Sequence, residues 1–346
     1  MRSDMTIFAI ETSCDETAVA VMREGRETLS SELFSQADKH ALYGGVVPEI
    51  ASRNHAAVLG RLSELALKNA DISKNEIDAV AVTYAPGLIG ALLVGVNYAK
   101  GLALALDVPL IPVHHIRGHI AANYIAYPEL EPPFLCIIVS GGNTLIADVR
   151  GYTDITIVGR SRDDAAGECF DKAARVLGLG YPGGPALDKL AQTGDDSLFD
   201  LPRPVIEGSP YDMSFSGLKT AVVNIVHNAE HKGEALDTAS LAASFACTVS
   251  DILVPRVMAA VAELGYDKIA IAGGVAANSR IRADFKKAAA ANGHTLFIPP
   301  LNLCGDNAAM IGCQGFYEYL AGVRGDMSLD AHATLDVDCV SERVTV

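Results

Sequence analysis

The sequence is poor in aromatic side chains and has no tryptophan: Phe, Tyr and Trp make up 6% of its 346 residues. It also lacks low-complexity tracts, and 50% of its residues are hydrophobic against 20% charged, a composition that excludes intrinsic disorder. A chain of this length exceeds one ordinary domain, so we expect two domains of roughly 150 to 180 residues.

Positive charge is also scarce. Lys and Arg number 27 against 42 Asp and Glu, which gives a net charge of −15. Such an acidic protein is not a general binder of nucleic acids or membrane surfaces, because both carry negative charge. Any contact with RNA would need a local basic patch or a basic partner.

Signals for disulfides, export and membrane insertion are missing as well. The seven cysteines include no Cys-x-x-Cys pair, which indicates reduced, buried thiols in a cytosolic protein. Residues 1–5 do not begin an apolar signal segment. Pro86-Gly87 cuts the uncharged run 79–99 into a strand and a helix, each expected to be too short to span a bilayer. We therefore expect a soluble, cytoplasmic protein with no membrane partner.

Hydrophobic patterning predicts the same α/β plan twice along the chain. The first half predicts a hairpin, a third strand, a long helix from Pro48 and two further strand–helix pairs, at 6–10, 17–22, 28–35, 79–83, 88–106, 109–113 and 115–127. After Glu131-Pro132-Pro133 the second half predicts strands at 134–139, 144–149, 154–158, 268–272 and 295–298. Its helices are expected at 164–178, 184–193, 215–230 and 238–264, and from 278 and 306.

This duplication is the plan of the actin, Hsp70 and sugar-kinase (ASKHA) superfamily, in which two similar domains surround a nucleotide cleft. We expect an N-terminal actin-like domain at residues 1–131. A C-terminal actin-like domain with helical insertions is expected at 132–346, with its final helix free to pack back on the first domain. The tail beyond about residue 326 carries no signal.

Glycine-rich turns follow two of the predicted strands, at Ser140-Gly141-Gly142 and Gly273-Gly274. Glycine lets the backbone approach a ligand closely, and its N–H groups can point at phosphate. A third such turn, 181–185, precedes Asp188. Asp171 could accept hydrogen bonds from ribose hydroxyls or pair with Arg175 four residues on, and spacing alone leaves both interpretations open.

Two histidines, His115 and His119, are spaced four residues apart on a predicted helix, so both rings project from one face. The repeat places Asp306 at the position equivalent to His119, so we expect ligands from both halves around one Fe(II) or Zn(II) ion. A purely structural histidine pair is the alternative. A zinc peptidase is disfavoured, because Ile116 replaces the glutamate of a His-Glu-x-x-His motif.

Long blocks of the chain match one family in order over about residues 6–322. The blocks are Ile10-Glu-Thr-Ser-Cys-Asp-Glu-Thr17, Gly44-Gly-Val-Val-Pro-Glu-Ile-Ala-Ser-Arg-Asn-His55, His114-His-Ile-Arg-Gly-His119, Val139-Ser-Gly-Gly142, Gly167-Glu-Cys-Phe-Asp-Lys172, Tyr181-Pro-Gly-Gly-Pro185, Ser214-Phe-Ser-Gly-Leu-Lys219, Gly273-Gly-Val-Ala-Ala-Asn278 and Asp306-Asn307. The chain resembles the bacterial tRNA N6-adenosine threonylcarbamoyltransferases (TsaD, formerly Gcp or YgjD).

The resemblance implies a metal-dependent acyltransferase that moves a threonylcarbamoyl group from threonylcarbamoyl-AMP to N6 of the adenosine 3′ of the anticodon, in tRNAs reading A-starting codons. It implies one divalent ion per subunit, Fe2+ before Zn2+, on His115, His119 and Asp306. The substrate-binding positions that it implies are Ile138, Val139, Ser140, Gly141, Gly142, Asp171, Gly184, Asp188 and Asn278. ATP or ADP could occupy the same cleft, and no catalytic residue is assigned beyond the metal site.

The partners implied by the resemblance are tRNA, bound through a complex, a TsaB-like paralogue, a TsaE-like ATPase and a TsaC-like enzyme that supplies the adenylate. Arg117 departs from the family pattern, since many relatives carry Glu there, but it should face away from the metal. Two other classes stay open. An ASKHA-type kinase or ATPase would place an Asp near the first hairpin, where this chain offers Glu11 and Asp15. A non-catalytic paralogous scaffold would not need the metal ligands.

Overall fold

The computed structural model describes residues 4–338 and divides them into two compact units. Unit 1 contains residues 4–132, 150–156 and 299–338, and unit 2 contains residues 133–149 and 157–298. The chain thus returns to unit 1 for its last part. The domains expected at 1–131 and 132–346 stay a prediction, and residues 1–3 and 339–346 lie outside the described residues.

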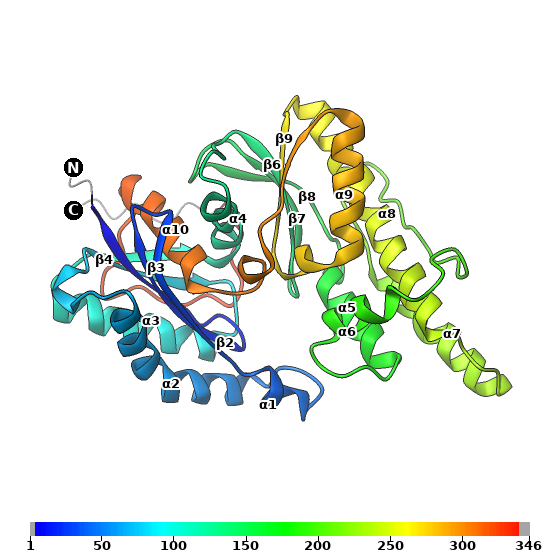
Figure 1. Ribbon diagram of the computed structural model, residues 1–346, viewed down its shortest axis with the longest axis horizontal. Coiled ribbons are helices and arrows are strands. Elements are labelled where there is room, and N and C mark those ends of the chain that lie inside the picture. The colour runs from blue at the N-terminus through cyan, green and yellow to red at the C-terminus, as the bar shows by residue number, and fades with distance from the viewer. Residues whose placement is uncertain (1–3, 339–346) are drawn as a thin grey trace. The chain divides into compact units, whose positions relative to one another are not determined.

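Unit 1 is built on a five-stranded sheet in the order β3-β2-β1-β4-β5 (Figure 1). Strands β1 to β3 form an antiparallel meander, and β4 and β5 run parallel to β1. β1 and β4 are mostly apolar and are buried throughout, because both faces of the sheet are covered. The strands are β1 (Thr6–Glu11), β2 (Glu16–Arg23), β3 (Glu27–Ser35), β4 (Ala79–Ala85) and β5 (Leu110–His114).

Unit 2 repeats this topology with the order β10-β9-β6-β7-β8, which read backwards matches the first sheet strand for strand. The hairpin β6–β7 is antiparallel, and β9 and β10 run parallel to β6. The predicted α/β duplication is therefore confirmed. The strands are β6 (Phe134–Val139), β7 (Thr144–Val149), β8 (Ile155–Arg160), β9 (Lys268–Ala272) and β10 (Thr295–Phe297).

Helices cover both faces of the unit 1 sheet (Figure 1). The helices α2 and α3 pack on the face that carries Phe8, Ile10 and Val80, whereas α10 lies on the opposite face over Ala9 and Met22. The alternation of neighbouring strand residues between the two faces follows from the two-residue period of a strand. The helices of unit 1 are α1 (Ala37–Ala41), α2 (Pro48–Asn69), α3 (Ile89–Leu106), α4 (His115–Ala126) and α10 (Ala308–Leu320), with short 3-10 turns η1 (Lys74–Glu76) and η3 (Leu301–Leu303).

In unit 2, α8 packs on β6 and α9 lies along β10, while α5 and α6 pack on each other. Residues 194–210 contain no helix or strand. The helices are α5 (Ala166–Val176), α6 (Gly183–Ala191), α7 (Ser216–Lys232), α8 (Thr238–Leu264) and α9 (Ser279–Asn292), with the 3-10 turn η2 (Gly274–Ala277).

The predicted strands and helices are confirmed within a few residues at each end. Sequence patterning missed α1, because five residues are too few to establish a helical period. The expectation that both parts of run 79–99 are too short for a membrane is corrected: α3 and also α8 are long and apolar enough by length and composition. Core helices of globular domains pass the same test, and 56% of the most apolar part of α8 is buried inside the protein.

The tail that carried no sequence signal packs along unit 1. The Gly325 amide donates to the Leu110 carbonyl, and the His332 amide donates to the Tyr84 carbonyl. Further on, the Arg117 guanidinium donates to the Val337 carbonyl through Nε and Nη2, at 3.1 and 2.9 Å. These contacts tie the tail to the ends of β4 and β5 and to the first turn of α4.

Candidate metal centre and glycine-turn site

The helix α4 begins directly after β5, so its first turn stands at the carboxyl end of the sheet. His114 is the N-cap residue, and its Nδ1 accepts a hydrogen bond from the Ile116 amide. His115 and His119 follow one turn apart on one face of the helix, as predicted. Between them, Gly118 has no side chain and lets Ile311 of α10 approach closely.

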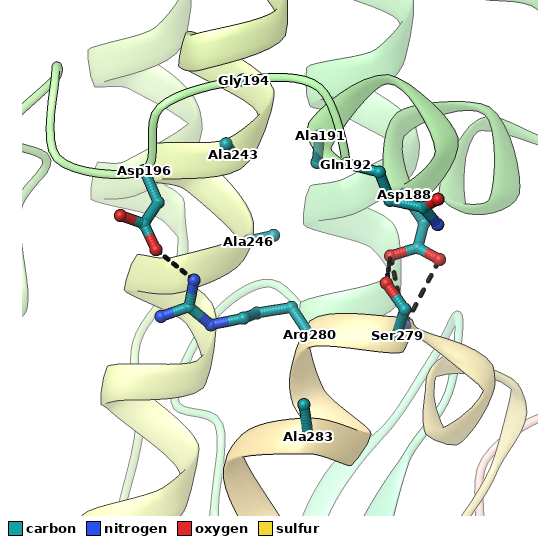
Figure 2. Close-up of a pocket in the computed structure, with 10 residues that line it drawn as sticks. All are labelled: Asp188, Ala191, Gln192, Gly194, Asp196, Ala243, Ala246, Ser279, Arg280 and Ala283. Carbon is teal, nitrogen blue, oxygen red and sulfur yellow. Dashed lines mark hydrogen bonds and ion pairs between the residues drawn. The ribbon is translucent and has the colours of Figure 1, made fainter.

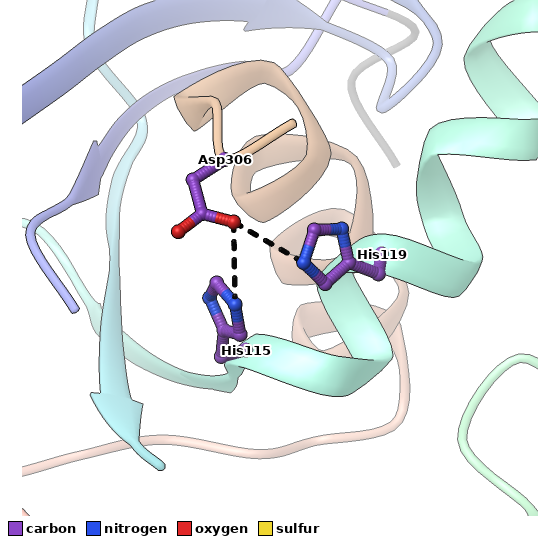
Figure 3. A group of neighbouring side chains, drawn as sticks. All are labelled: His115, His119 and Asp306. Atoms are coloured by element: carbon purple, nitrogen blue, oxygen red, sulfur yellow. Dashed lines mark ion pairs between the residues drawn. The ribbon is translucent and has the colours of Figure 1, made fainter. Parts of the chain in front are cut away.

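Close packing of α10 brings Asp306 to the two histidines. A Cβ atom at Gly312 or Gly315 would overlap side-chain atoms of Met22 or Ala81, so these glycines let the helix lie against the sheet. The Asn307 side chain caps α10 by accepting from the Met310 amide at 2.9 Å. Asp306 therefore stands just before the first helical turn, and Figure 3 shows its carboxylate directed at both imidazole rings.

The three side chains converge on one point. Asp306 Oδ1 lies 3.2 Å from His119 Nε2 and 3.5 Å from His115 Nε2. Donor atoms bound at about 2.0–2.2 Å around one ion in tetrahedral or octahedral geometry are separated by about 3.0–3.5 Å, so these spacings fit one ion. His119 is 1% exposed, its Nδ1 has no hydrogen-bond partner among the described residues, and its Nε2 faces the Asp306 carboxylate. A buried imidazole whose Nε2 meets a carboxylate oxygen is placed to share an ion with it.

The electrostatics of the group also favour a cation. Burial alone would raise the pKa of Asp306, but the two histidines outweigh it and hold that pKa at about 2. Burial would lower the pKa of His115, yet Asp306 and Glu11 raise it to about 9. Without an ion, His115 therefore carries a proton at neutral pH, and a bound metal ion would take over this positive charge.

All three residues belong to unit 1. The expectation that the ligands come from both halves is therefore wrong. The chain crosses back at residue 299, and α10 completes the first sheet rather than the second. The sequence repeat correctly paired Asp306 with the histidines but did not reveal this return.

Sequence reasoning missed a buried network behind His115. Glu11, at the end of β1, accepts from His115 Nδ1 at 2.9 Å and from the Thr83 hydroxyl at 2.6 Å. The Ser13 hydroxyl lies 3.2 Å from the same Nδ1 atom. This is not a Ser-His-carboxylate triad, because there the serine and the carboxylate contact opposite ring nitrogens. The available signal was a Glu directly after the apolar strand predicted at 6–10.

In unit 2, two other glycines pack closely against the backbone at the turn 140–142. A Cβ atom at Gly167, in the first turn of α5, would overlap the Ser140 carbonyl. A Cβ atom at Gly273, which has a φ of +91°, would overlap the Val139 carbonyl. Gly141 and Gly142 are exposed and have open space where a Cβ would stand, whereas Ile138 and Val139 are fully buried. Those two strand residues therefore support the turn from within the core.

The predicted polar residues of unit 2 form two groups. Asp171 Oδ1 accepts from the Gly183 and Gly184 amides at 3.1 and 3.2 Å, and so orders the first turn of α6. Asp188 accepts from the Ser279 hydroxyl at 2.8 Å, and Asn278 caps α9 through its Oδ1 atom.

A pocket of about 270 Å3 lies beside Asp188 and Ser279. Figure 2 shows Asp188 and the Arg280–Asp196 ion pair at its edges, and its walls carry several small alanines. This volume lies just below the range of about 300–1,000 Å3 that is usual for small-molecule sites.

Arg117, which lies between the two histidines in sequence, contacts other groups, as expected. It is 3% exposed and pairs with Glu318 at 2.9 Å, in addition to its bonds to the tail. Ile116 is also buried, so no general base follows His115. The argument against a zinc-peptidase site stays as predicted from the sequence.

Comparison with known proteins gives one consistent result. Residues 27–313 match the family model described as tRNA N6-adenosine threonylcarbamoyltransferase. The curated protein of that name from Clostridioides difficile (strain 630) is 48% identical over 97% of this chain and 99% of its own length. The one from Staphylococcus carnosus (strain TM300) is 49% identical over 98% of both chains.

Solved structures show the same fold. HypF from T. kodakarensis is similar with a TM-score of 0.61 and 18% identity, over 92% of this chain and 48% of that one. Component A of (R)-2-hydroxyglutaryl-CoA dehydratase from Acidaminococcus fermentans gives 0.53 and 16%, over 92% and 98%. These neighbours have ASKHA-type folds, in agreement with the predicted class, and at such identities they speak for the fold alone. By its matched family model and its near-full-length relatives, the chain belongs to the tRNA N6-adenosine threonylcarbamoyltransferase family.

Proposed function

We propose that this chain transfers the threonylcarbamoyl group of threonylcarbamoyl-AMP to N6 of the adenosine 3′ of the anticodon, in tRNAs reading A-starting codons. Modification of adenosine N6 in tRNA follows from family membership. The donor and the tRNA subset come from the sequence resemblance. The observation that carries the proposal is the convergence of His115, His119 and Asp306 in a member of this family.

In the reaction, adenosine N6 attacks the carbamoyl carbon, the bond from that carbon to the AMP phosphate oxygen breaks, and N6 loses a proton. We assign the adenylate to unit 2, where the exposed amides of Gly141 and Gly142 suit a phosphate. Asp171 and Asp188 offer acceptors to ribose hydroxyls, and the Asn278 amide nitrogen offers a donor. ATP or ADP would use the same contacts.

One divalent ion, Fe2+ before Zn2+, is assigned to the three ligands of unit 1. When bound, it supplies a Lewis acid with open coordination positions that polarises the transferred carbonyl. The residues of the chain hold that position: α4 sets the two imidazoles, and α10 sets the carboxylate. Two imidazoles and one carboxylate are donors that both metals accept.

The raised pKa values of three cysteine thiols support direct attack by N6 rather than a covalent enzyme intermediate. Burial raises the pKa of the Cys14 thiol well above its usual value, and it raises those of Cys169 and Cys313 to about 12. These thiols stay protonated at neutral pH, and a protonated thiol is a poor nucleophile.

The kinase and scaffold alternatives are weaker. Glu11 is 0% exposed and bonded to His115, so it is not placed to organise Mg-ATP at the first hairpin. A scaffold would not require the intact metal ligands. The proposed partners are tRNA, a TsaB-like paralogue, a TsaE-like ATPase and a TsaC-like supplier of the adenylate, in the cytoplasm. At a net charge of −15 the lone chain should bind tRNA weakly, because charge repulsion opposes it.

The decisive experiment is mass spectrometry of tRNA nucleosides from cells depleted of this protein. N6-threonylcarbamoyladenosine should disappear, and wild-type protein should restore it, whereas a His115→Ala/His119→Ala double variant should not. Purified chain with its partners, threonylcarbamoyl-AMP and unmodified tRNA should form the same nucleoside. Turnover of ATP on sugars without tRNA would instead support the kinase alternative.

A further inference from the structure

Glu11 is an isolated acidic residue in the core of unit 1. It is the last residue of β1, pairs with Ala18 of β2 and is 0% exposed. Burying a carboxylate is costly unless hydrogen bonds replace its lost water. This carboxylate therefore needs compensating partners, and their identity indicates its role.

Three donors surround the two carboxylate oxygens. The Ser13 amide donates to Oε1, while the Thr83 hydroxyl and His115 Nδ1 both reach Oε2, at 2.6 and 2.9 Å. Only an ionised carboxylate accepts at both oxygens without offering a hydrogen of its own. The donor geometry therefore indicates a buried anion.

This anion determines which nitrogen of His115 can bind a ligand. Because Nδ1 is committed to Glu11 as an N–H donor, Nε2, which lies 3.5 Å from Asp306, is the nitrogen that can give up its proton and bind an ion. His119 has no such support, since its Nδ1 atom has no hydrogen-bond partner among the described residues. The two histidines of the metal centre are thus held unequally.

We propose that Glu11 is the positioning residue of the metal centre: its carboxylate holds His115 as the Nδ1–H tautomer and directs Nε2 at the ion. A carboxylate behind a metal-binding imidazole fixes the ring orientation and makes the nitrogen a stronger ligand. The inference rests on the metal site of the proposed function and adds a residue that itself touches neither metal nor substrate.

The test compares Glu11→Gln with Thr83→Val. Glutamine keeps the size of the side chain but places an NH2 group against one of the three donors and removes the charge. Valine removes one hydrogen bond to the same carboxylate and leaves the Glu11–His115 contact in place, so it controls for general loosening of the core. Zn2+ affinity is measured by calorimetry on metal-free protein, and thermal melting of the same samples confirms folding.

Wild-type protein should bind one Zn2+, and Glu11→Gln should bind it about 10–100-fold more weakly. Thr83→Val should stay within about 3-fold of wild type. Equal affinity of Glu11→Gln and wild type would overturn the inference and leave the metal site standing. An equal loss in both variants would reduce Glu11 to a structural role. Failure of wild-type protein to bind any divalent ion would overturn the metal site of the proposed function as well.

A measurement on wild-type protein keeps the inference testable if Glu11→Gln does not fold. In Zn2+-loaded protein labelled with 15N-histidine, His115 should carry its proton on Nδ1 and none on Nε2. The opposite tautomer, with the proton on Nε2, would overturn the inference directly. His115 signals are identified by their loss in a His115→Gln variant.

Discussion

The hairpin turns of the two units occupy equivalent places in matching sheets, but one presents polar side chains and the other presents backbone amides. In unit 1, Glu11 and Ser13 bring a buried charge and a hydroxyl to His115. In unit 2, the turn 140–142 brings exposed glycine amides. In both units a glycine that follows the neighbouring parallel strand lies close to this hairpin: Gly87 after β4 lies against the Ser13 carbonyl, and Gly273 after β9 lies against the Val139 carbonyl. The duplicated backbone was kept, and the function diverged in the side chains that the turn carries.

The two sites should therefore respond differently to mutation. A site made of side chains depends on a few ligand atoms, so removing one should abolish it while the fold survives. A site made of backbone amides depends on the close approach of strands and helices, so it should fail when a glycine gains a Cβ atom. The predictions below test this contrast.

The largest effect should come from His119→Ala. Loss of a direct ligand should weaken Zn2+ binding by more than about 100-fold, because loss of an outer partner alone costs about 10–100-fold. Transfer to tRNA should fall below detection, with ADP binding in unit 2 unchanged by calorimetry. The control is His114→Asn, which keeps an N-cap acceptor and should retain Zn2+. Full transfer by His119→Ala would remove the metal centre from the reaction.

Gly273→Ala should destabilise unit 2 by about 2–4 kcal/mol, because the new Cβ atom meets the Val139 carbonyl and the φ of +91° is strained. Calorimetric melting should show this loss, and ADP affinity should fall while Zn2+ affinity stays. Gly274→Ala is the matched control, since nothing lies within 4 Å of its Cβ position. If both variants melt at the same temperature, the close approach of Gly273 to the Val139 carbonyl does not contribute to the stability of unit 2.

Asp171→Ala should weaken ADP binding by about 1–3 kcal/mol, the usual range for a hydrogen bond to a charged group. Asp171→Asn retains an acceptor for the Gly183 and Gly184 amides, so it should lose less than Asp171→Ala. Calorimetric titration of both variants with ADP separates a direct contact of Asp171 with the nucleotide from its role in ordering the first turn of α6. Unchanged affinity of Asp171→Ala would exclude this residue from the nucleotide site.

The smallest effect concerns Glu16 in unit 1. Burial is the main cause that raises the pKa of Glu16 to about 7, and its Oε2 atom has no hydrogen-bond partner in the described part of the chain. The folded state then binds a proton that the unfolded state releases near pH 4.5, so stability should fall as pH rises from about 4.5 to 7.

Replacing Glu16 with Gln removes this titration. Between pH 5 and pH 8, metal-free wild type should lose about 1–2 kcal/mol more of its unfolding free energy than Glu16→Gln. Urea denaturation at the two pH values measures the difference. Parallel losses in both proteins would show that Glu16 ionises normally.

Local patterns predicted the strands, the helices and the repeat, because hydrophobic periods and glycine turns act over short stretches. The two histidines were predictable for the same reason, since one helix carries both. Glu11 was not, because its partners Thr83 and His115 are distant in sequence and meet only in the folded sheet. The assignment of Asp306 to unit 1 depends on the packing of α10, which no local pattern encodes.

The return of the chain to unit 1 at residue 299 also matters during synthesis. Ala9, Met22 and Ala81 lie beneath the glycines of α10, so this apolar sheet face has no cover until those residues emerge. The segment from 133 to 298 must be translated first, which at about 5–20 residues per second takes roughly 10–30 s. A nascent chain therefore exposes an apolar sheet face, which is prone to aggregation, for that interval. Chaperone binding and the translation rate of residues 133–298 should then affect the yield of native protein.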